Sequence, residues 1–262
     1  MDARKAIFIT GAASGIGRAT ALLFAGQGWF VGGYDRNAEG LTSLAGEIGA
    51  DGCITGLLDV TDKPAFEAAL AGFAERTGGR LDLLFNNAGI GRGGPFDQQP
   101  FEDILETVRV NLIGVLNGIH SALPLLKATP GSLCFTTSSS SATYGMPNIA
   151  VYSATKHAVK GLTEALSVEM KAHGVRVADT LPGLIDTPIL PPEAKARADK
   201  EGMWRLIPPI EVARAVWAAY HGDKIHWYVP PELFEFDTLA TANPEGVRDQ
   251  MAASGGVLRG GD

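Results

Sequence analysis

Residues 5–24 read KAIFITGAASGIGRATALLF and give the clearest indication of the fold. An apolar run over 5–10 leads directly into a glycine-rich turn over 10–17, and apolar residues with helical spacing follow over 18–28. A strand that is apolar throughout is typical of a parallel sheet buried on both faces. Glycines allow a tight turn and a close approach of backbone to a ligand, and the free N–H groups of the following helix suit a pyrophosphate. A tight turn without a ligand remains the alternative.

The rest of the chain repeats the alternation of strand and helix. The strand patterns lie at 29–35, 52–60, 81–89, 131–138 and 175–183, and the helical patterns at 38–49, 63–78, 101–127 and 150–173. This order predicts one doubly wound α/β domain over 1–230, a parallel sheet with helices on both faces. Residues 231–262 show no clear period and end in glycine and charge, so we interpret them as a C-terminal tail.

Composition excludes several classes of protein. The 262 residues carry a net charge of −7 without a local cluster of Lys and Arg, which argues against nucleic acid as a partner. No apolar run reaches the ~20 residues of a membrane span, and none resembles a signal peptide, so we expect a cytoplasmic protein without a membrane partner. Cys53 and Cys134 are expected to be buried thiols, and His221 and His226 lack a third ligand, so no metal site is predicted.

The segment YSATK, residues 152–156, carries a second signal. Tyr152 and Lys156 are four residues apart and therefore share one face of a helix. A phenol and a lysine ammonium both have pKa values of about 10 in water, so neither exchanges protons easily near neutral pH. Their pairing indicates a site in which one group shifts the pKa of the other.

Two carboxylates follow the second and third strand patterns. Asp35 lies where it would bind the hydroxyl groups of an adenosine ribose and repel a 2′-phosphate, although a simple turn is the alternative. The neighbouring Arg36 could instead bind a 2′-phosphate, so NADP remains an alternative. We therefore expect NAD, with NADP second. Asp59 is a candidate adenine contact, but this turn also offers an ordinary helix N-cap, with Thr61 or Asp62.

The ordered set of motifs resembles the short-chain dehydrogenase/reductase family. The matching segments are TGAASGIG at 10–17, DV at 59–60, NNAG at 86–89, Asn111, YSATK at 152–156 and PG at 182–183. They cover about 1–190 in the order and spacing of that family. The resemblance implies a Rossmann-like fold and a hydride transfer that depends on NAD or NADP.

The resemblance also implies a catalytic group. By position it comprises Asn111, Ser139, Tyr152 and Lys156. The family's serine usually lies 13 residues before the tyrosine, which selects Ser139, and Pro147 supports this register. Ser138 and Ser140 remain alternatives, because four serines are adjacent and side chains alternate along a strand.

Each of these residues has an expected role. Tyr152 would exchange the substrate proton, which requires a pKa lowered by the Lys156 cation and by the oxidised nicotinamide. The resemblance gives Lys156 a second role, binding the nicotinamide ribose. Ser139 would polarise the substrate oxygen, and Asn111 would interrupt its helix and hold a water of a proton relay.

The cofactor site is expected along the same motifs. Its predicted residues are Gly11, Ser14, Gly15, Ile16, Gly17, Asp35, Arg36, Asp59, Val60, Asn87, Ala88, Gly89, Tyr152, Lys156, Pro182, Gly183 and Thr187. Thr187 matches the family's carboxamide-binding threonine. Because it precedes Pro188, it is also consistent with a plain helix start.

The substrate is expected to be a small alcohol or ketone, apolar or aromatic. Its pocket would be bounded by the loop after Ala88, the loop 144–146 and a mobile lid over 189–207, with Ile189, Leu190, Met203 and Trp204 directed inward. The alternatives are an NADP-dependent ketoacyl or carbonyl reductase and a non-catalytic dinucleotide-binding regulator. A homodimer or homotetramer is also expected, with the dimer contact through the helices at 101–127 and 150–173.

Overall fold

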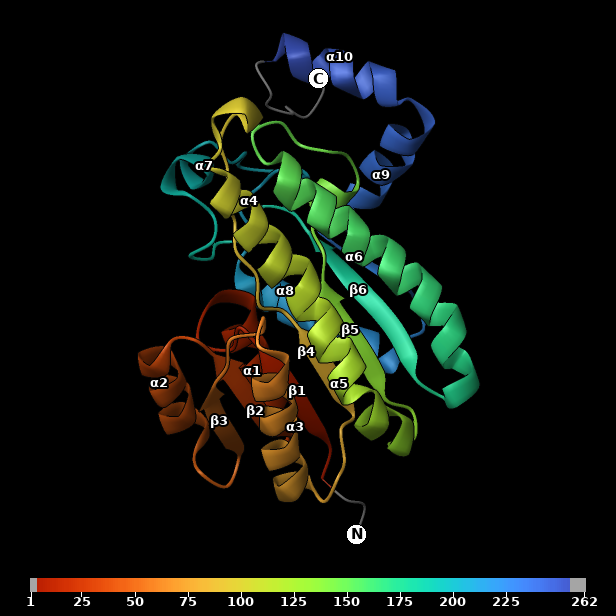
Figure 1. Ribbon diagram of the computed structural model, residues 1–262. Coiled ribbons are helices and arrows are strands. Elements are labelled where there is room, and N and C mark those ends of the chain that lie inside the picture. The colour runs from red at the N-terminus through yellow and green to blue at the C-terminus, as the bar shows by residue number, and fades with distance from the viewer. Residues whose placement is uncertain (1–3, 255–262) are drawn as a thin grey trace.

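Seven parallel strands form the central sheet of residues 4–254, the part of the chain described by this computed structural model. In spatial order they are β3 (Cys53–Leu57), β2 (Phe30–Asp35), β1 (Ala6–Thr10), β4 (Leu83–Asn86), β5 (Leu133–Thr137), β6 (Arg176–Pro182) and β7 (His226–Val229) (Figure 1). Neighbouring strands pair in parallel throughout. The order reverses between β1 and β4, so the predicted doubly wound sheet is confirmed.

Helices cover both faces of this sheet. One face carries α3 (Lys63–Thr77), α4 (Phe101–Val108), α5 (Gly114–Ala128) and α6 (Ala150–Glu169), and the other carries α1 (Gly15–Gly26), α2 (Ala38–Ile48) and α8 (Pro209–His221). Side chains of β1 alternate between the two cores: Phe8 packs into the first, and Ile7 and Ile9 into the second. The strands are therefore apolar throughout because both of their faces are buried.

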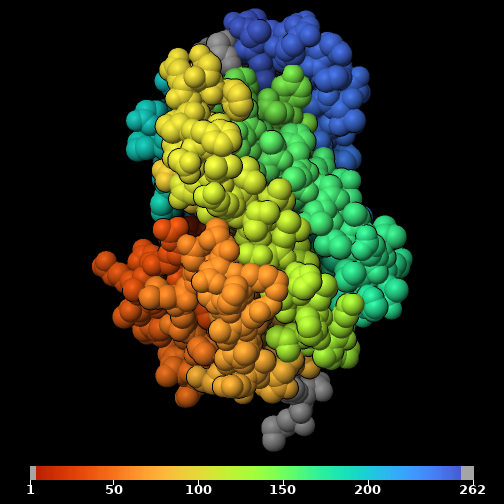
Figure 2. All heavy atoms as spheres, in the orientation of Figure 1, coloured from red at the N-terminus to blue at the C-terminus, as the bar shows by residue number. Residues whose placement is uncertain are grey.

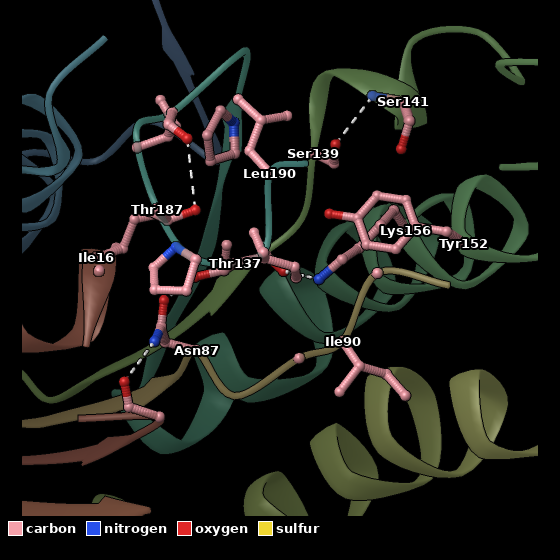
Figure 3. A pocket seen from close by; sticks show the side chains of 18 of the residues that line it. Ile16, Asn87, Ile90, Thr137, Ser139, Ser141, Tyr152, Lys156, Thr187 and Leu190 are labelled. Carbon is pink, nitrogen blue, oxygen red and sulfur yellow. Dashed lines mark hydrogen bonds between the residues drawn. The ribbon is translucent and has the colours of Figure 1, made fainter. Parts of the chain in front are cut away.

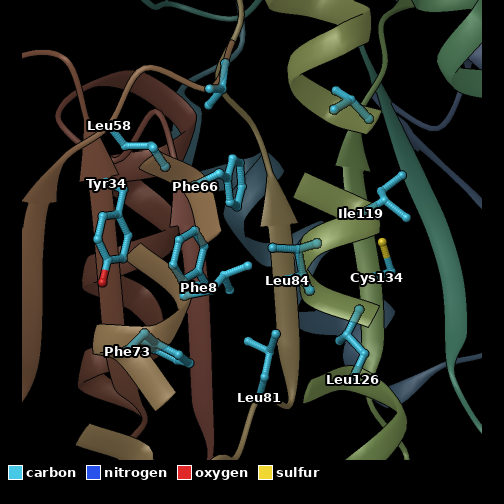
Figure 4. Packing of buried hydrophobic residues seen from close by; sticks show 14 of the residues in the cluster. Phe8, Tyr34, Leu58, Phe66, Phe73, Leu81, Leu84, Ile119, Leu126 and Cys134 are labelled. Carbon is cyan, nitrogen blue, oxygen red and sulfur yellow. The ribbon is translucent and has the colours of Figure 1, made fainter. Parts of the chain in front are cut away.

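Aromatic rings fill the core beside α3 (Figure 4). Phe8 stacks on Tyr34 with ring centroids 4.3 Å apart, and Phe66 and Phe73 pack around it. A Cβ at Gly32 would lie 2.5 Å from Cδ2 of Phe73. Glycine in the middle of β2 therefore makes room for this ring.

The helix predicted over 101–127 is divided. A π-helical turn, η2 (Arg109–Ile113), separates α4 from α5. Asn111 lies in this turn and is fully buried, with its side-chain amide bonded to the backbone of Ile90. Single π turns of this kind often mark functional sites.

The predicted tail is folded as far as the structure describes it. It forms α9 (Leu233–Ala242) and α10 (Pro244–Ala253), whereas residues 255–262 lie outside the described part. The buried stripe of α9 comprises Leu233, Phe236, Asp237 and Ala240. Its helical period is hidden in the sequence because the stripe includes the charged Asp237 while Phe234 and Leu239 are exposed.

Short elements complete the chain. They are η1 (Phe96–Gln98), η3 (Ser140–Ala142), η4 (Met170–His173) and α7 (Pro192–Ala196). Within residues 4–254, no helix has the length and apolar character needed to cross a membrane.

Candidate active site

One cavity of about 1510 Å³ lies at the carboxyl ends of the strands. This is the edge at which doubly wound sheets bind ligands. The loops after the first six strands all contribute to its wall. Of the predicted cofactor residues, all except Gly17 line this cavity, and of the four predicted catalytic residues, all except Asn111 do so.

The glycine turn forms one wall of the cavity. Gly11 has φ +70°, and a Cβ there would lie 2.9 Å from Nδ2 of Asn87. A Cβ at Gly17 would lie 2.1 Å from the carbonyl oxygen of Gly11, so Gly17 closes the turn from behind. Ser14 is the N-cap residue of α1, and its hydroxyl makes no capping hydrogen bond. The first turn of α1 is thus open to an anion.

Asp35 ends β2 at the cavity wall. Its Oδ2 accepts a hydrogen bond from the Ala13 amide at 3.0 Å, and its Oδ1 accepts one from the Asn37 amide at 3.0 Å. Arg36 extends to Asp59, with Nη1 and Oδ2 3.8 Å apart. The turn that holds Asp35 therefore points the carboxylate at the glycine loop and the guanidinium at β3.

The helix N-cap after β3 falls on Asp62. Its side chain accepts a hydrogen bond from the Ala65 amide at 3.0 Å. Asp59 instead accepts hydrogen bonds from the backbone amide and hydroxyl of Thr61, and it lines the cavity. Val60 lies beside it, and its carbonyl oxygen accepts a hydrogen bond from Asn117.

Asn87 connects the ends of three strands. Its Nδ2 donates to the carbonyl oxygens of Thr10 and Gly11, and its Oδ1 accepts from the hydroxyl of Thr137 at 3.1 Å (Figure 3). The Thr10 hydroxyl accepts from the amides of Asn87 and Ala88. Sequence reasoning did not single out Thr10 or Thr137, because their roles depend on contacts between distant strands.

Tyr152, Lys156 and Ser139 meet at the inner end of the cavity (Figure 3). The ammonium of Lys156 lies 5.5 Å from the centre of the Tyr152 ring and donates to the carbonyl oxygen of Thr137 at 2.7 Å. The Ser139 hydroxyl faces the Tyr152 hydroxyl and accepts a hydrogen bond from the amide of Ser141 at 3.1 Å (Figure 3). Two hydroxyls and one amine therefore converge here.

The neighbouring serine has a different partner. The Ser138 hydroxyl donates to the carbonyl oxygen of Lys156 at 2.9 Å and ties β5 to α6. Among these adjacent serines, the geometry therefore favours Ser139 over Ser138 as the one that faces the Tyr152 hydroxyl.

Asn111 acts on the loop after β4. Its Oδ1 accepts from the Ile90 amide and its Nδ2 donates to the Ile90 carbonyl oxygen, both at 2.9 Å. A Cβ at Gly89 would lie 3.2 Å from Oδ1 of Asn111 and 3.8 Å from the amine of Lys156. The Asn111 side chain therefore fixes this loop beside Lys156.

Burial controls the charges in this site. It lowers the pKa of Lys156 to about 8, against an opposing attraction from Asp179. Burial also raises the pKa of Tyr152, and only the neighbouring Ser139 hydroxyl opposes this. The expected lowering of the Tyr152 pKa is thus not produced by the chain alone, because desolvation outweighs the effect of Ser139.

The end of β6 and the loop that follows it supply a further part of the cavity wall. Thr187 is buried, and its methyl group would lie 2.9 Å from a Cβ at Gly15. The next helix, α7, begins only at Pro192, so Thr187 is not a helix start. Pro182 and Gly183 line the cavity, and the Gly183 amide donates to the carbonyl oxygen of Val229 at 2.7 Å.

The remaining wall of the cavity is largely apolar. Its side chains include Ile90, Val110, Met146, Ile149, Ile189, Leu190 and Trp204. Met203 was also expected to point inward, but it packs against α9 and α10 instead. At the mouth, Arg92 forms an ion pair with Glu106 at 2.8 Å. Among residues 4–254, no group of three His, Cys, Asp or Glu side chains is placed to hold a metal ion.

Comparison with known families decides the classification. A family profile described as short chain dehydrogenase matches residues 5–198, which include the glycine turn, Tyr152 and Lys156. The chain belongs to the short-chain dehydrogenase/reductase family. It is an oxidoreductase of this family that acts on alcohol or ketone substrates, and such enzymes use NAD or NADP.

One curated protein and two solved structures illustrate the similarity of this chain to other members of the family. Cyclohexanol dehydrogenase from Acinetobacter sp. (strain SE19) is 37% identical over 215 residues, 81% of this chain and 86% of that protein. The structure of a 3-ketoacyl-(acyl-carrier-protein) reductase from Brucella melitensis complexed with NADH has a TM-score of 0.79 at 30% identity, covering 86% of this chain and 96% of that one. A family member from Burkholderia phymatum in complex with NAD has a TM-score of 0.82 at 25% identity, covering 92% and 94% of the two chains.

Proposed function

We propose that this short-chain dehydrogenase/reductase transfers a hydride between NAD and an apolar or aromatic secondary alcohol or its ketone. One observation carries the proposal. A single cavity has the Asp35 carboxylate on one wall and the hydroxyls of Ser139 and Tyr152, with Lys156, on another. A dinucleotide bound between them would have its ribose at Asp35 and its reactive ring beside the two hydroxyls.

The residues would divide the chemistry among them. The nicotinamide, when bound, accepts the hydride from the alcohol carbon or supplies it to the ketone. Ser139 donates a hydrogen bond to the substrate oxygen, and Tyr152 takes its proton during oxidation or returns it during reduction. Lys156 favours the tyrosinate and binds the nicotinamide ribose. Asn111 holds the loop of Ile90 in place beside this group.

The preference for NAD rests on Asp35. Both of its oxygens accept backbone hydrogen bonds, which fix the carboxylate at the glycine turn. A fixed negative charge there would repel a 2′-phosphate. Arg36 would have to leave Asp59 to bind that phosphate.

The preference for an apolar substrate rests on the aliphatic and aromatic wall around Trp204. Such a wall suits a ring or a chain without charge, because a buried ion without a partner is costly. The name of the similar cyclohexanol dehydrogenase is consistent with this choice. A ketoacyl reductase, as in the similar Brucella protein, is the second candidate.

A screen of secondary alcohols tests the proposal. Cyclic, aromatic and linear alcohols are supplied with NAD or NADP, and nicotinamide reduction is followed by absorbance. We expect turnover with NAD on apolar alcohols and a loss of at least ~10²-fold in kcat for Tyr152→Phe with cofactor affinity retained. Activity confined to NADP and acyl thioesters would support the second candidate. Cofactor binding without any turnover would indicate a regulator.

A further inference from the structure

The C-terminal helices pack on the substrate end of the cavity. Phe236 and Ala240 of α9 form a cluster with Val247 and Met251 of α10, and Tyr144, Met146, Met203 and Trp204 pack against it. Of these, Met146 and Trp204 also line the cavity. Both helices lie beyond residue 198, where the family match ends. They therefore support, from behind, the wall around the proposed substrate.

Trp204 is held from behind by α9. The rings of Trp204 and Phe236 meet edge to face, with centroids 5.5 Å apart. Arg205 forms an ion pair with Glu232, the N-cap residue of α9, at 3.1 Å. The Trp204 carbonyl oxygen accepts a hydrogen bond from the amide of Asp199. The position of the Trp204 ring therefore depends on where α9 lies.

The position of α9 in turn depends on Asp237. This carboxylate is buried, and its Oδ2 accepts hydrogen bonds from Nζ of Lys160 at 2.7 Å and from the hydroxyl of Tyr228 at 2.5 Å. Lys160 lies on α6, one helical turn beyond Lys156 and two beyond Tyr152. Asp237 thus fastens α9 to the helix that carries the proposed catalytic pair.

We propose that Asp237 is a positioning residue for the substrate site: bound to Lys160, it holds α9 so that Phe236 presses Trp204 against the substrate. The proposal rests on the alcohol dehydrogenase function proposed above. A buried ion pair that loses one partner leaves the other charge desolvated, so either single substitution should loosen α9. Cofactor contacts lie on other loops and should be little affected.

Two single variants, Asp237→Asn and Lys160→Met, test this arrangement in the full-length protein. We expect the KM for a secondary alcohol to rise about tenfold while the Kd for NADH, from fluorescence titration, changes less than twofold. Hydrogen exchange should become faster in 199–207 and in 233–253. Glu235→Gln is the matched control, because Glu235 is an exposed carboxylate on the same helix, and it should leave all three measurements unchanged.

A double variant separates docking from charge and guards against misfolding of the single variants. Lys160→Met with Asp237→Leu replaces the buried pair by apolar side chains, which often keeps such a contact stable. We expect it to restore the alcohol KM and the slow exchange. Two results would overturn the proposal: faster exchange in α9 without a change in alcohol KM, or parallel losses in kcat, alcohol KM and NADH affinity. A wild-type protein that oxidises no alcohol would instead refute the proposed function.

Discussion

Lys156 is the residue at which burial and charge compete most directly. The side chain is 3% exposed, and burial lowers its pKa from 10.5 to about 8 while Asp179 opposes the change. The unfolded chain keeps the proton until about pH 10.5, so between these two values the unfolded state binds more protons and stability rises with pH. Below pH 8 both states are protonated, and the folded protein carries the full cost of the buried cation.

Lys156→Met removes this cost and should stabilise the protein at pH 7. Lowering the pKa from 10.5 to about 8 corresponds to ~3 kcal/mol. The gain should become ~2 kcal/mol smaller at pH 9.5, where the wild-type lysine is already neutral in the folded state. Urea unfolding of both proteins at the two pH values measures this difference. An equal gain at both would show that Lys156 keeps its proton in the fold.

Asp35 should decide the choice of cofactor through its charge. Asp35→Ser removes the repulsion of a 2′-phosphate and leaves one hydroxyl to bond the amides of Ala13 and Asn37. We expect the affinity for NADP to rise and that for NAD to fall, each by ~tenfold. Titrations with both reduced cofactors measure the change, and Asp35→Asn is the control that keeps the shape. Tighter binding of NADP by the wild type would contradict the assignment.

At the scale of elements, the segment 189–207 should act as a lid with two parts. Residues around α7 are exposed, and an ion pair between Lys195 and Asp186 joins them to the loop after β6. Trp204 instead packs against Phe236 of α9. We expect hydrogen exchange to slow when cofactor and product bind, and most of all over 189–198. Equal protection with and without ligands would make this segment a fixed wall.

Trp204→Ala tests the inner surface of that lid. The substitution removes a large apolar contact from the substrate end of the cavity, so the alcohol KM should rise about tenfold or more while NAD affinity stays nearly constant. Phe234→Ala is the control, because Phe234 is exposed on α9 and does not line the cavity. An equal rise in alcohol KM for both variants would mean that disturbing α9, and not the loss of the Trp204 ring from the cavity, causes the effect.

The sequence predicted those elements whose signals are local. The glycine turn and the Tyr152 helix lie within single continuous segments, so their spacing indicates both fold and site. Other features depend on contacts between distant segments, which the periodicity of a single segment does not show. Examples are the π turn at Asn111 and the packing of Trp204 against Phe236. For the same reason α9 escaped prediction: a buried Asp237 makes sense only once Lys160 is placed opposite it.

At the scale of the whole molecule, α4, α5 and α6 form one continuous outer face (Figure 2). Phe101, Ile113 and Leu116 are 68%, 41% and 39% exposed on α4, the π turn and α5. Other apolar residues of these helices, such as Val115 and Val159, are buried against the sheet and are not available to a partner. The surplus of apolar surface is therefore smaller than the sequence alone suggests, and it is concentrated along the outer side of α4 and α5.

We propose that this face joins two copies of the chain about a two-fold axis. Exposed apolar side chains on adjacent helices favour a symmetric contact, because a two-fold axis places the same patch of each copy against the other and buries both. Leu116→Glu would place two like charges near that axis, so the variant should elute as a single chain of 27.5 kDa while the wild type elutes at twice that mass. Light scattering after size exclusion measures both. Leu57→Glu is the control, because Leu57 is 68% exposed on the edge strand β3, away from this face. A wild-type protein that is already monomeric at micromolar concentration would refute the contact. A Leu116→Glu variant that remains a dimer would show that the two copies meet through another face.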